Sequence, residues 1–473
     1  MICNTFRSTT KIMMMKRIII LLSILTGILN TSVAQQLPSF KPLRYEEDYT
    51  ALKKDSASEN WYKRAKYSAL SNGGNTYISY GGELRLQYFY AKNESWGDEP
   101  EDKDGYVLSR YLLHTDFHAG KHFRTFVQLQ GSLADGKTST SPVDENPLDL
   151  HQAFVDFNTN LSSKTKIIFR LGRQELSYGS QRLVSVRDGP NNRQAFDGAK
   201  LSVLSSQYKL DIFYSHYVAA KKEIFDDGWN KNTRFWGSYM TLNNVLILEN
   251  MDVYYLGIWR RNTSFDEGAG KETRHSVGTR IWGKKNALKY DMEALYQFGD
   301  FESKRISAWT ASANMGYEFI AVRYKPELGL KAELISGDSK PGDEVLQTFN
   351  PLFPRGAYFG LAALIGPSNL IDLHPSVSFE LTSKLDWNMD YDIFWRYSAA
   401  DGIYAPNTSL MYSGKNSLKK HIGQQVSTEL VYTPNPFLYF RAEFTWFKAG
   451  GYLKEVSAGK NILFAGITAQ LKF

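Results

Sequence analysis

The sequence NILFAGITAQLKF, residues 461–473, alternates in the way typical of a membrane β-strand. Its apolar residues fall two apart: Leu463, Ala465, Ile467, Ala469, Leu471 and Phe473. Most of the residues between them are small or polar, so one strand face is apolar and the other can face water. A strand of a soluble β-sandwich has the same pattern, and alternation alone leaves both folds open. A terminal apolar strand leaves an edge that needs a partner, and closure of a barrel supplies one. We therefore predict the closing strand of an outer-membrane barrel, with Phe473 as the end recognised by the barrel-assembly machinery.

Residues 1–34 have the features of a secretory signal peptide. Lys16 and Arg17 precede an apolar run, 18–27, and small residues follow before Gln35. That run is too short to cross a bilayer as a helix. The single cysteine, Cys3, would leave with the signal peptide, so we expect no disulfide or thiol chemistry in the mature chain. No later segment approaches eighteen consecutive apolar residues, which argues against a transmembrane helix.

The composition fits a membrane barrel better than a nucleic-acid-binding protein. Aromatic residues make up 14% of the chain, and a barrel uses them as girdles at both membrane interfaces. The formal net charge is +7, but the cationic residues are scattered without a basic helix or tail. We therefore predict an outer-membrane protein of a Gram-negative bacterium that contacts lipid and binds no nucleic acid.

The chain order predicts a periplasmic pre-barrel segment, 35–74, followed by an antiparallel transmembrane β-barrel, 75–473. The first barrel strand is expected at 77–90, and counting such segments gives about eighteen strands once 356–364 is assigned to a loop, because the strand number should be even. Short periplasmic turns are predicted at 120–121, 158–164, 205–206, 283–286, 387–389 and 433–436. Long extracellular loops are predicted at 91–104, 134–147, 172–197, 219–232, 262–272, 299–304, 338–372, 399–419 and 449–460. A barrel of this width leaves an aqueous lumen.

Charged residues on the wet strand faces are predicted to point into that lumen, because a charge facing lipid would cost about 2–4 kcal/mol. They include Asp116, Arg124, Asp156, Lys200, Arg280, Lys331, Arg396 and Arg441. Two interpretations remain open from the residues alone. One is the polar wall of a general porin, and the other is an anion pathway in which arginines attract a negative solute at several weak sites.

Catalytic and metal sites are not expected. His114, Asp116 and His118 share a strand face, but successive side chains on one face lie roughly 7 Å apart, too far for three of them to bind one ion. No nucleophile motif accompanies a Ser/His/Asp set. We predict neither an enzyme nor a cofactor or metal requirement. A pre-barrel segment of roughly 40 residues is also too short for the globular plug of a receptor.

Residues 170–200 (RLGRQELSYGSQRLVSVRDGPNNRQAFDGAK) form the densest charged patch of the chain. Their glycines and proline indicate a loop of fixed shape. Such a long connection is either a solvated surface loop or one that folds across the barrel entrance and carries function.

This patch resembles the alginate export family of outer-membrane porins. The matching motifs are Leu171-Gly172-Arg173-Gln174-Glu175, Tyr178-Gly179, Arg182, Arg187-Asp188-Gly189, Asn192-Arg193 and Phe196-Asp197-Gly198, with Arg44-Tyr45-Glu46-Glu47-Asp48, Gly82-Glu83-Leu84-Arg85, Arg110, His114, Asp116, Phe126-Val127-Gln128 and His151-Gln152-Ala153-Phe154 upstream. The resemblance implies a monomeric barrel of 18 strands that passes a polyuronate through an arginine-rich constriction. The candidates for the basic lining are Arg85, Arg110, Arg170, Arg173, Arg182 and Arg193, with Glu83 and Asp197 as countercharges. A general porin for small anions or sugars is the alternative.

Overall fold

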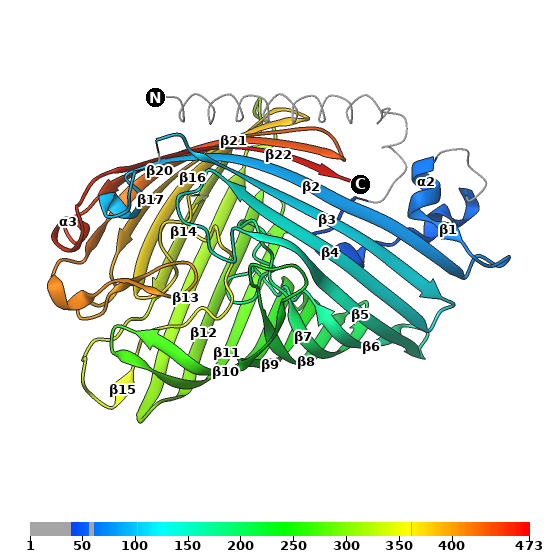
Figure 1. The fold of residues 1–473 in the computed structure, drawn as a ribbon, viewed down its shortest axis with the longest axis horizontal. Helices are drawn as coiled ribbons and strands as arrows, with labels where there is room; N and C mark the ends of the chain where they lie inside the picture. Colours follow the sequence, from blue (N-terminus) through cyan, green and yellow to red (C-terminus); the bar gives the residue numbers. More distant parts are fainter. Residues whose placement is uncertain (1–38, 56–60, 102, 361) are drawn as a thin grey trace.

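The computed structural model describes residues 39–55, 61–101, 103–360 and 362–473 and consists almost entirely of one closed antiparallel sheet (Figure 1). Eighteen long strands form the wall, as predicted. They are β2 (Thr76–Lys92), β3 (Tyr106–Ala119), β4 (Phe123–Asp135), β5 (Asn146–Ser162), β6 (Thr165–Gln174), β7 (Phe196–Ser205), β8 (Tyr208–Ala219), β9 (Gly228–Val245), β10 (Leu248–Phe265), β11 (Gly268–Lys285), β12 (Leu288–Phe301), β13 (Lys304–Glu318), β14 (Glu327–Ile335), β16 (Leu370–Thr382), β17 (Leu385–Trp395), β20 (His421–Asn435), β21 (Leu438–Ala449) and β22 (Ile462–Lys472). In the described part of the chain no helix is long and apolar enough to cross a membrane.

The barrel closes between its first and last long strands, as the C-terminal pattern predicted. β22 pairs with β2 from Glu83 opposite Lys472 to Lys92 opposite Leu463, and Figure 1 shows the two strands side by side. The backbone N–H of Phe473 donates to the Gly82 carbonyl at 3.0 Å, which continues this pairing. Both edges of the sheet are therefore satisfied.

The period-two pattern of β2 sorts its side chains as expected. Ser79, Glu83, Arg85 and Gln87 are buried in the barrel interior, whereas Tyr80 and Tyr88 on the other face are 43% and 41% exposed. On β2 the outer face of the wall is thus aromatic and the interior face is polar, the pattern expected of a transmembrane barrel.

Three predicted connections were wrong. Segments 262–272 and 299–304 are not long loops: β10–β11 and β12–β13 are joined at 266–267 and 302–303. Their strands carry polar residues beyond the apolar band, so the strand ends resemble loops in sequence. The turn predicted at 387–389 lies inside β17, and the chain reverses at 383–384 instead because β16 begins earlier than expected. Residues 356–360 and 362–364 are outside any strand, in agreement with the loop assignment.

The pre-barrel residues lie at the barrel end that carries Phe473, which we call the periplasmic end following the sequence prediction. They form η2 (Arg44–Glu46), η3 (Thr50–Asp55), α2 (Trp61–Lys66) and the short β1 (Ser68–Ala69), which pairs with β2. The Arg44 guanidinium donates to the carbonyls of Gly82 and Phe473, both at 2.9 Å. The predicted signal peptide falls in residues 1–38, outside the described part.

Two long extracellular connections pass into the interior of the barrel. One is the 175–195 segment between β6 and β7, and the other is the 336–369 segment between β14 and β16, which includes the short β15 (Val345–Leu346). The remaining connections carry η4 (Glu94–Gly97), β18 (Ile403–Tyr404), β19 (Leu410–Tyr412), η5 (Gly414–Asn416) and α3 (Leu453–Val456). We call the two inward segments loop A (175–195) and loop B (336–369).

Candidate functional site

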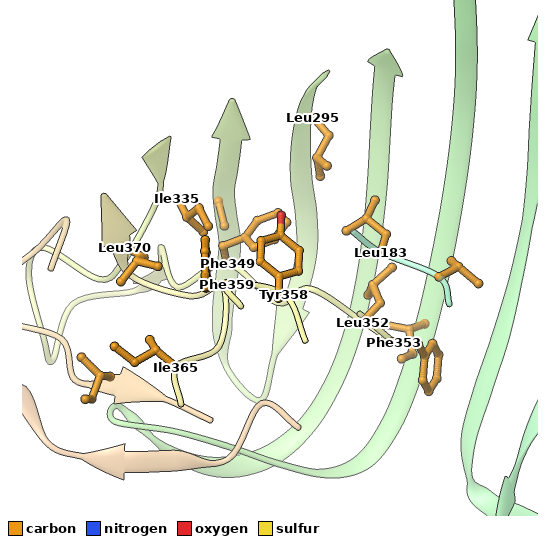
Figure 2. Close-up of a cluster of buried hydrophobic side chains, with 14 of the residues drawn as sticks. Leu183, Leu295, Ile335, Phe349, Leu352, Phe353, Tyr358, Phe359, Ile365 and Leu370 are labelled. Atoms are coloured by element: carbon orange, nitrogen blue, oxygen red, sulfur yellow. The ribbon is translucent and has the colours of Figure 1, made fainter. Parts of the chain in front are cut away.

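Loops A and B contact each other inside the barrel through backbone hydrogen bonds. The Phe353 N–H donates to the Leu183 carbonyl at 2.9 Å, and the Ser185 N–H donates to the Phe353 carbonyl at 3.0 Å. The Arg355 N–H adds a bond to the Gln181 carbonyl at 3.1 Å. Figure 2 shows Leu183 of loop A next to Leu352 and Phe353 of loop B, in front of the strands of the wall. The two loops therefore form one partition across part of the lumen.

Aromatic side chains fix this partition to the wall. The Phe353 ring centroid lies 5.0 Å from those of Phe196 and Phe235 and 5.6 Å from that of Tyr217. Phe353 is only 4% exposed. Edge-to-face and stacked rings at these distances stabilise a contact beyond the effect of buried area. The interior of this barrel thus contains an apolar core as well as polar walls.

Three of the six predicted arginines converge on the tip of loop A. Arg110 lies 2.6 Å from a Glu83 carboxylate oxygen and 2.7 Å from one of Asp188. Arg193 lies 3.2 Å from the same Asp188 oxygen. Arg85 donates to the backbone carbonyls of Asp188 at 2.6 Å and of Pro190 at 2.8 Å. The Asp188 side chain is 54% exposed although its arginine partners are buried, so it faces open space in the lumen.

Arg193 also ties loop A to the barrel wall. Its guanidinium lies 2.7 Å from a Glu175 carboxylate oxygen, which is itself 2.8 Å from Nε2 of His151 on β5. These groups are buried, and charge-assisted hydrogen bonds of this kind are about twice as strong as neutral ones. The cluster of Arg85, Arg110 and Arg193 therefore holds the loop in position.

The other three predicted arginines lie apart from this cluster. Arg170 forms two hydrogen bonds with Asp156, at 2.7 and 2.8 Å, and its guanidinium stacks on the Phe154 ring at 3.7 Å. Arg173 forms two with Asp197, one of the two predicted countercharges, at 2.8 and 3.1 Å.

Arg182 reaches from loop A across to the opposite wall. It lies 3.4 Å from a Glu293 oxygen on β12 and 3.5 Å from a Glu333 oxygen on β14. It also donates to the hydroxyls of Thr310 and Tyr358. Each of the six arginines therefore already has protein partners, and the role of these residues in contacting a solute stays a prediction.

Two cavities lie on either side of the partition. The cavity at the periplasmic end has a volume of about 670 Å³. Its basic lining residues are Lys53, Lys121, Arg124, Lys166, Arg170, Lys200 and Lys209, and its acidic ones are Glu46, Glu47 and Asp48. The cavity at the extracellular end is about 360 Å³ and is lined by Arg187 and Arg260 together with Tyr217, Asn230 and Asn262. Basic groups are thus available to a solute at both ends.

A comparison with protein-family models matches residues 76–460 to the family described as alginate export. The chain belongs to the alginate export family. The motif-based resemblance is thereby confirmed, and membership makes the chain an outer-membrane channel. No curated protein sequence matches this alginate export barrel.

Several solved porin structures share the fold of this alginate export barrel. OpdK of Pseudomonas aeruginosa with vanillate has a TM-score of 0.55 at 9% identity, covering 84% of this chain and 98% of its own. OccD3 (OpdP) of the same organism has a TM-score of 0.56 at 13% identity, covering 87% and 93%. OccK2 (OpdF) in complex with glucuronate has a TM-score of 0.53 at 11% identity, covering 83% and 98%. At these identities the likeness concerns the fold alone.

The exposed basic residues of the two cavities were largely missed from the sequence. Lys166 and Lys209 were not singled out, although Lys166 and Arg170 share a face of β6 by their even spacing. That spacing could have identified Lys166. Arg187 was only noted among the charges of loop A, and nothing in the sequence indicated that this loop would bring it near Arg260 of β10.

Proposed function

We propose that this alginate export barrel is a passive, monomeric channel in the outer membrane of a Gram-negative bacterium, and that it conducts an anionic polysaccharide of the alginate type or its oligomers. The observation that carries the proposal is the charge of the periplasmic cavity, where seven Lys and Arg side chains face three acidic ones. Arg124 and Arg170 are paired with Asp116 and Asp156, and Glu47 is paired with Arg44, which leaves five lysines against Glu46 and Asp48. A low-dielectric cleft lined by one sign of charge concentrates solutes of the other sign.

The proposed route runs from the periplasmic cavity past the tip of loop A to the extracellular cavity. Lys166 and Lys209 are exposed within the first cavity, and the Lys209 side chain is 45% exposed. Arg187 and Arg260 offer guanidinium groups at the far side, where two parallel hydrogen bonds can bind each uronate carboxylate. Several weak sites in series let a charged chain bind and still leave.

The predicted arginines divide into two roles in this proposal. Arg170 lines the periplasmic cavity and contacts the solute, whereas Arg85, Arg110, Arg173, Arg182 and Arg193 position loop A and the wall around it. Glu83 and Asp197 compensate the positioning arginines Arg110 and Arg173. No catalytic step is involved in passage through the channel.

A porin for small carboxylates is the second candidate. Two of the barrels with this fold are complexes with vanillate and with glucuronate, and both ligands carry a carboxylate. The cavities are large enough for such molecules, and the same basic groups would bind them.

Planar-bilayer recordings of the purified mature chain separate the two candidates. We expect anion selectivity and block by micromolar polymannuronate or polyguluronate. The double variant Lys166→Gln/Lys209→Gln should lower the polymer affinity by about tenfold, because it removes two of the exposed charges of the cavity. Lys285→Gln is the matched control, since Lys285 is exposed at the end of β11 and lines neither cavity. Block by monomeric glucuronate equal to that by the polymer would favour the small-carboxylate porin, and cation selectivity would refute both.

A further inference from the structure

The wall opposite loop A contains a group of ligand-type side chains that the transport pathway does not use. Asp372 and His374 on β16 and Asp392 on β17 each offer an atom, and these atoms all lie within 4.8 Å of one another. The two strands are neighbours, with Asp372 opposite Phe394 and Leu373 opposite Ile393. Facing side chains on adjacent strands are about 5 Å apart, closer than residues two apart along one strand. Cross-strand placement thus achieves the convergence that a single strand cannot.

The carboxylates of this group lack the partners that burial demands. Asp372 is 1% exposed, and neither of its carboxylate oxygens has a hydrogen-bond partner among the described residues. Asp392 is fully buried, and its Oδ1 contacts Nδ1 of His374, an imidazole that supplies a countercharge only when it is protonated. A buried carboxylate without hydrogen bonds or countercharge is strongly unfavourable. The unpartnered Asp372 carboxylate beside that of Asp392 indicates that a positive ligand belongs between them.

The protein cations near the group do not fill this role. Lys331 pairs with His374 across β14 and β16, but its ammonium lies 3.4 Å from Glu333 and over the Phe359 ring at 4.7 Å. Gln425 donates one hydrogen bond to Oδ2 of Asp392, and Oδ1 is in contact with the His374 imidazole. The Asp372 carboxylate therefore stays without a partner.

We propose that Asp372, His374 and Asp392 bind a divalent transition-metal ion, with Zn²⁺ the best match. One imidazole nitrogen with two carboxylates suits Zn²⁺, whereas Ca²⁺ and Mg²⁺ take oxygen ligands almost exclusively. With Nδ1 of His374 on the metal, its Nε2 is left 3.7 Å from an oxygen of Asp390. Metal-bound histidines usually direct their second nitrogen at such a carboxylate, which fixes the ring and strengthens the ligand. Three protein ligands leave the fourth tetrahedral position for water or a solute group.

The metal would also brace loop B. Gln425 bridges Asp392 and the Phe359 carbonyl of loop B, the latter at 2.7 Å. A metal bound between β16 and β17 would neutralise the carboxylates of Asp372 and Asp392 and so hold the Gln425 bridge to loop B in position. This site goes beyond the proposed polyuronate conduction and does not depend on it.

A second acidic group in the barrel provides a contrast. Asp149, Asp226 and Asp227 also bring ligand atoms within 4.8 Å. Asp227, however, accepts hydrogen bonds from Asn146 and the Lys221 N–H, at 2.8 and 2.7 Å. Its oxygens are already occupied, so we assign no ion to this group and use it as a control.

Calorimetric titration of the full mature chain with Zn²⁺, in detergent after chelator treatment, tests the assignment. We expect one Zn²⁺ to bind per chain. Asp372→Asn and His374→Ala should each raise the Kd for Zn²⁺ at least about tenfold, and Asp390→Asn should raise it by about tenfold. Asp226→Asn should leave Kd unchanged. Heat-modifiable migration on gels verifies that each variant forms the barrel, and X-ray absorption should show one nitrogen from histidine with oxygen ligands. Unchanged Kd in a folded Asp372→Asn barrel, or equal competition by Ca²⁺, would overturn the proposal.

Discussion

Replacement of Phe353 by alanine should release loop B from the barrel wall. The ring is 4% exposed and contacts Phe196, Tyr217 and Phe235. Removing a buried Phe side chain costs about 3–5 kcal/mol, which equals or exceeds the contribution of the three backbone bonds between the loops at about 1 kcal/mol each. Since about 1.4 kcal/mol is a factor of ten, the population with the partition displaced should rise by about 100-fold or more.

Single-channel recordings measure this population as the frequency of large-conductance openings. Phe444→Ala is the matched control, because Phe444 on β21 is 40% exposed on the outer face and loses the same atoms. We expect Phe353→Ala to raise the opening frequency by about two orders of magnitude and Phe444→Ala to leave it unchanged. If the two variants record alike while both barrels are folded, the partition does not depend on this aromatic contact and the reasoning is wrong.

Two further predictions concern buried charges. Arg110→Gln leaves the buried Glu83 carboxylate without its cation, so it should lower the free energy of unfolding in denaturant by about 3–5 kcal/mol. Lys325→Gln, which breaks an exposed pair, should change that free energy by less than about 1 kcal/mol. Similar losses in both variants would contradict the burial argument. Burial, with the nearby Arg44, lowers the pKa of Lys66 from 10.5 to about 7. Between pH 7 and 10 the undocked segment keeps the Lys66 proton that the docked segment has lost, so the free energy of docking α2 should become more favourable by about 1.4 kcal/mol per pH unit as pH rises. The measurement is the rate of proteolysis of the pre-barrel segment, which should fall as pH rises. Lys66→Met should abolish that pH dependence, and a variant that keeps it would exclude Lys66 as the cause.

The direction of the strand side chains could be predicted from the sequence, because an apolar medium outside the barrel and water inside it require alternating apolar and polar residues along every strand. In β2 the residues predicted to face the lumen are buried inside, and Tyr80 and Tyr88 face outward. The strand ends could not be predicted equally well. Outside the lipid band no solvent difference separates the two faces, so the polar residues around 262–272 extend β10 and β11 without an alternating signal.

The positions of the arginines in the lumen were predictable, but their partners were not. A register argument places Arg85 and Arg110 on the inner face. It does not reveal that loop A turns inward and brings Asp188 to both Arg110 and Arg193. The sequence therefore did not predict that Arg85, Arg110 and Arg193 hold loop A in position. Exposed lysines such as Lys166 were overlooked because single lysines on a strand carry no motif.

The candidate metal group shows how one misplaced turn conceals a site. With the turn predicted at 387–389, Asp390 and Asp392 would begin a new strand out of register with Asp372 and His374. In the structure the chain turns at 383–384, and Ser376 pairs with Asp390. That register puts His374 beside Asp392 on the inner face. Because side-chain direction alternates with every residue, a shift of one position in either strand would turn the ligand groups of that strand to the outer face. The convergence of Asp372, His374 and Asp392 thus follows from strand pairing alone, and Zn²⁺ binding would be an independent measurement of the β16–β17 register.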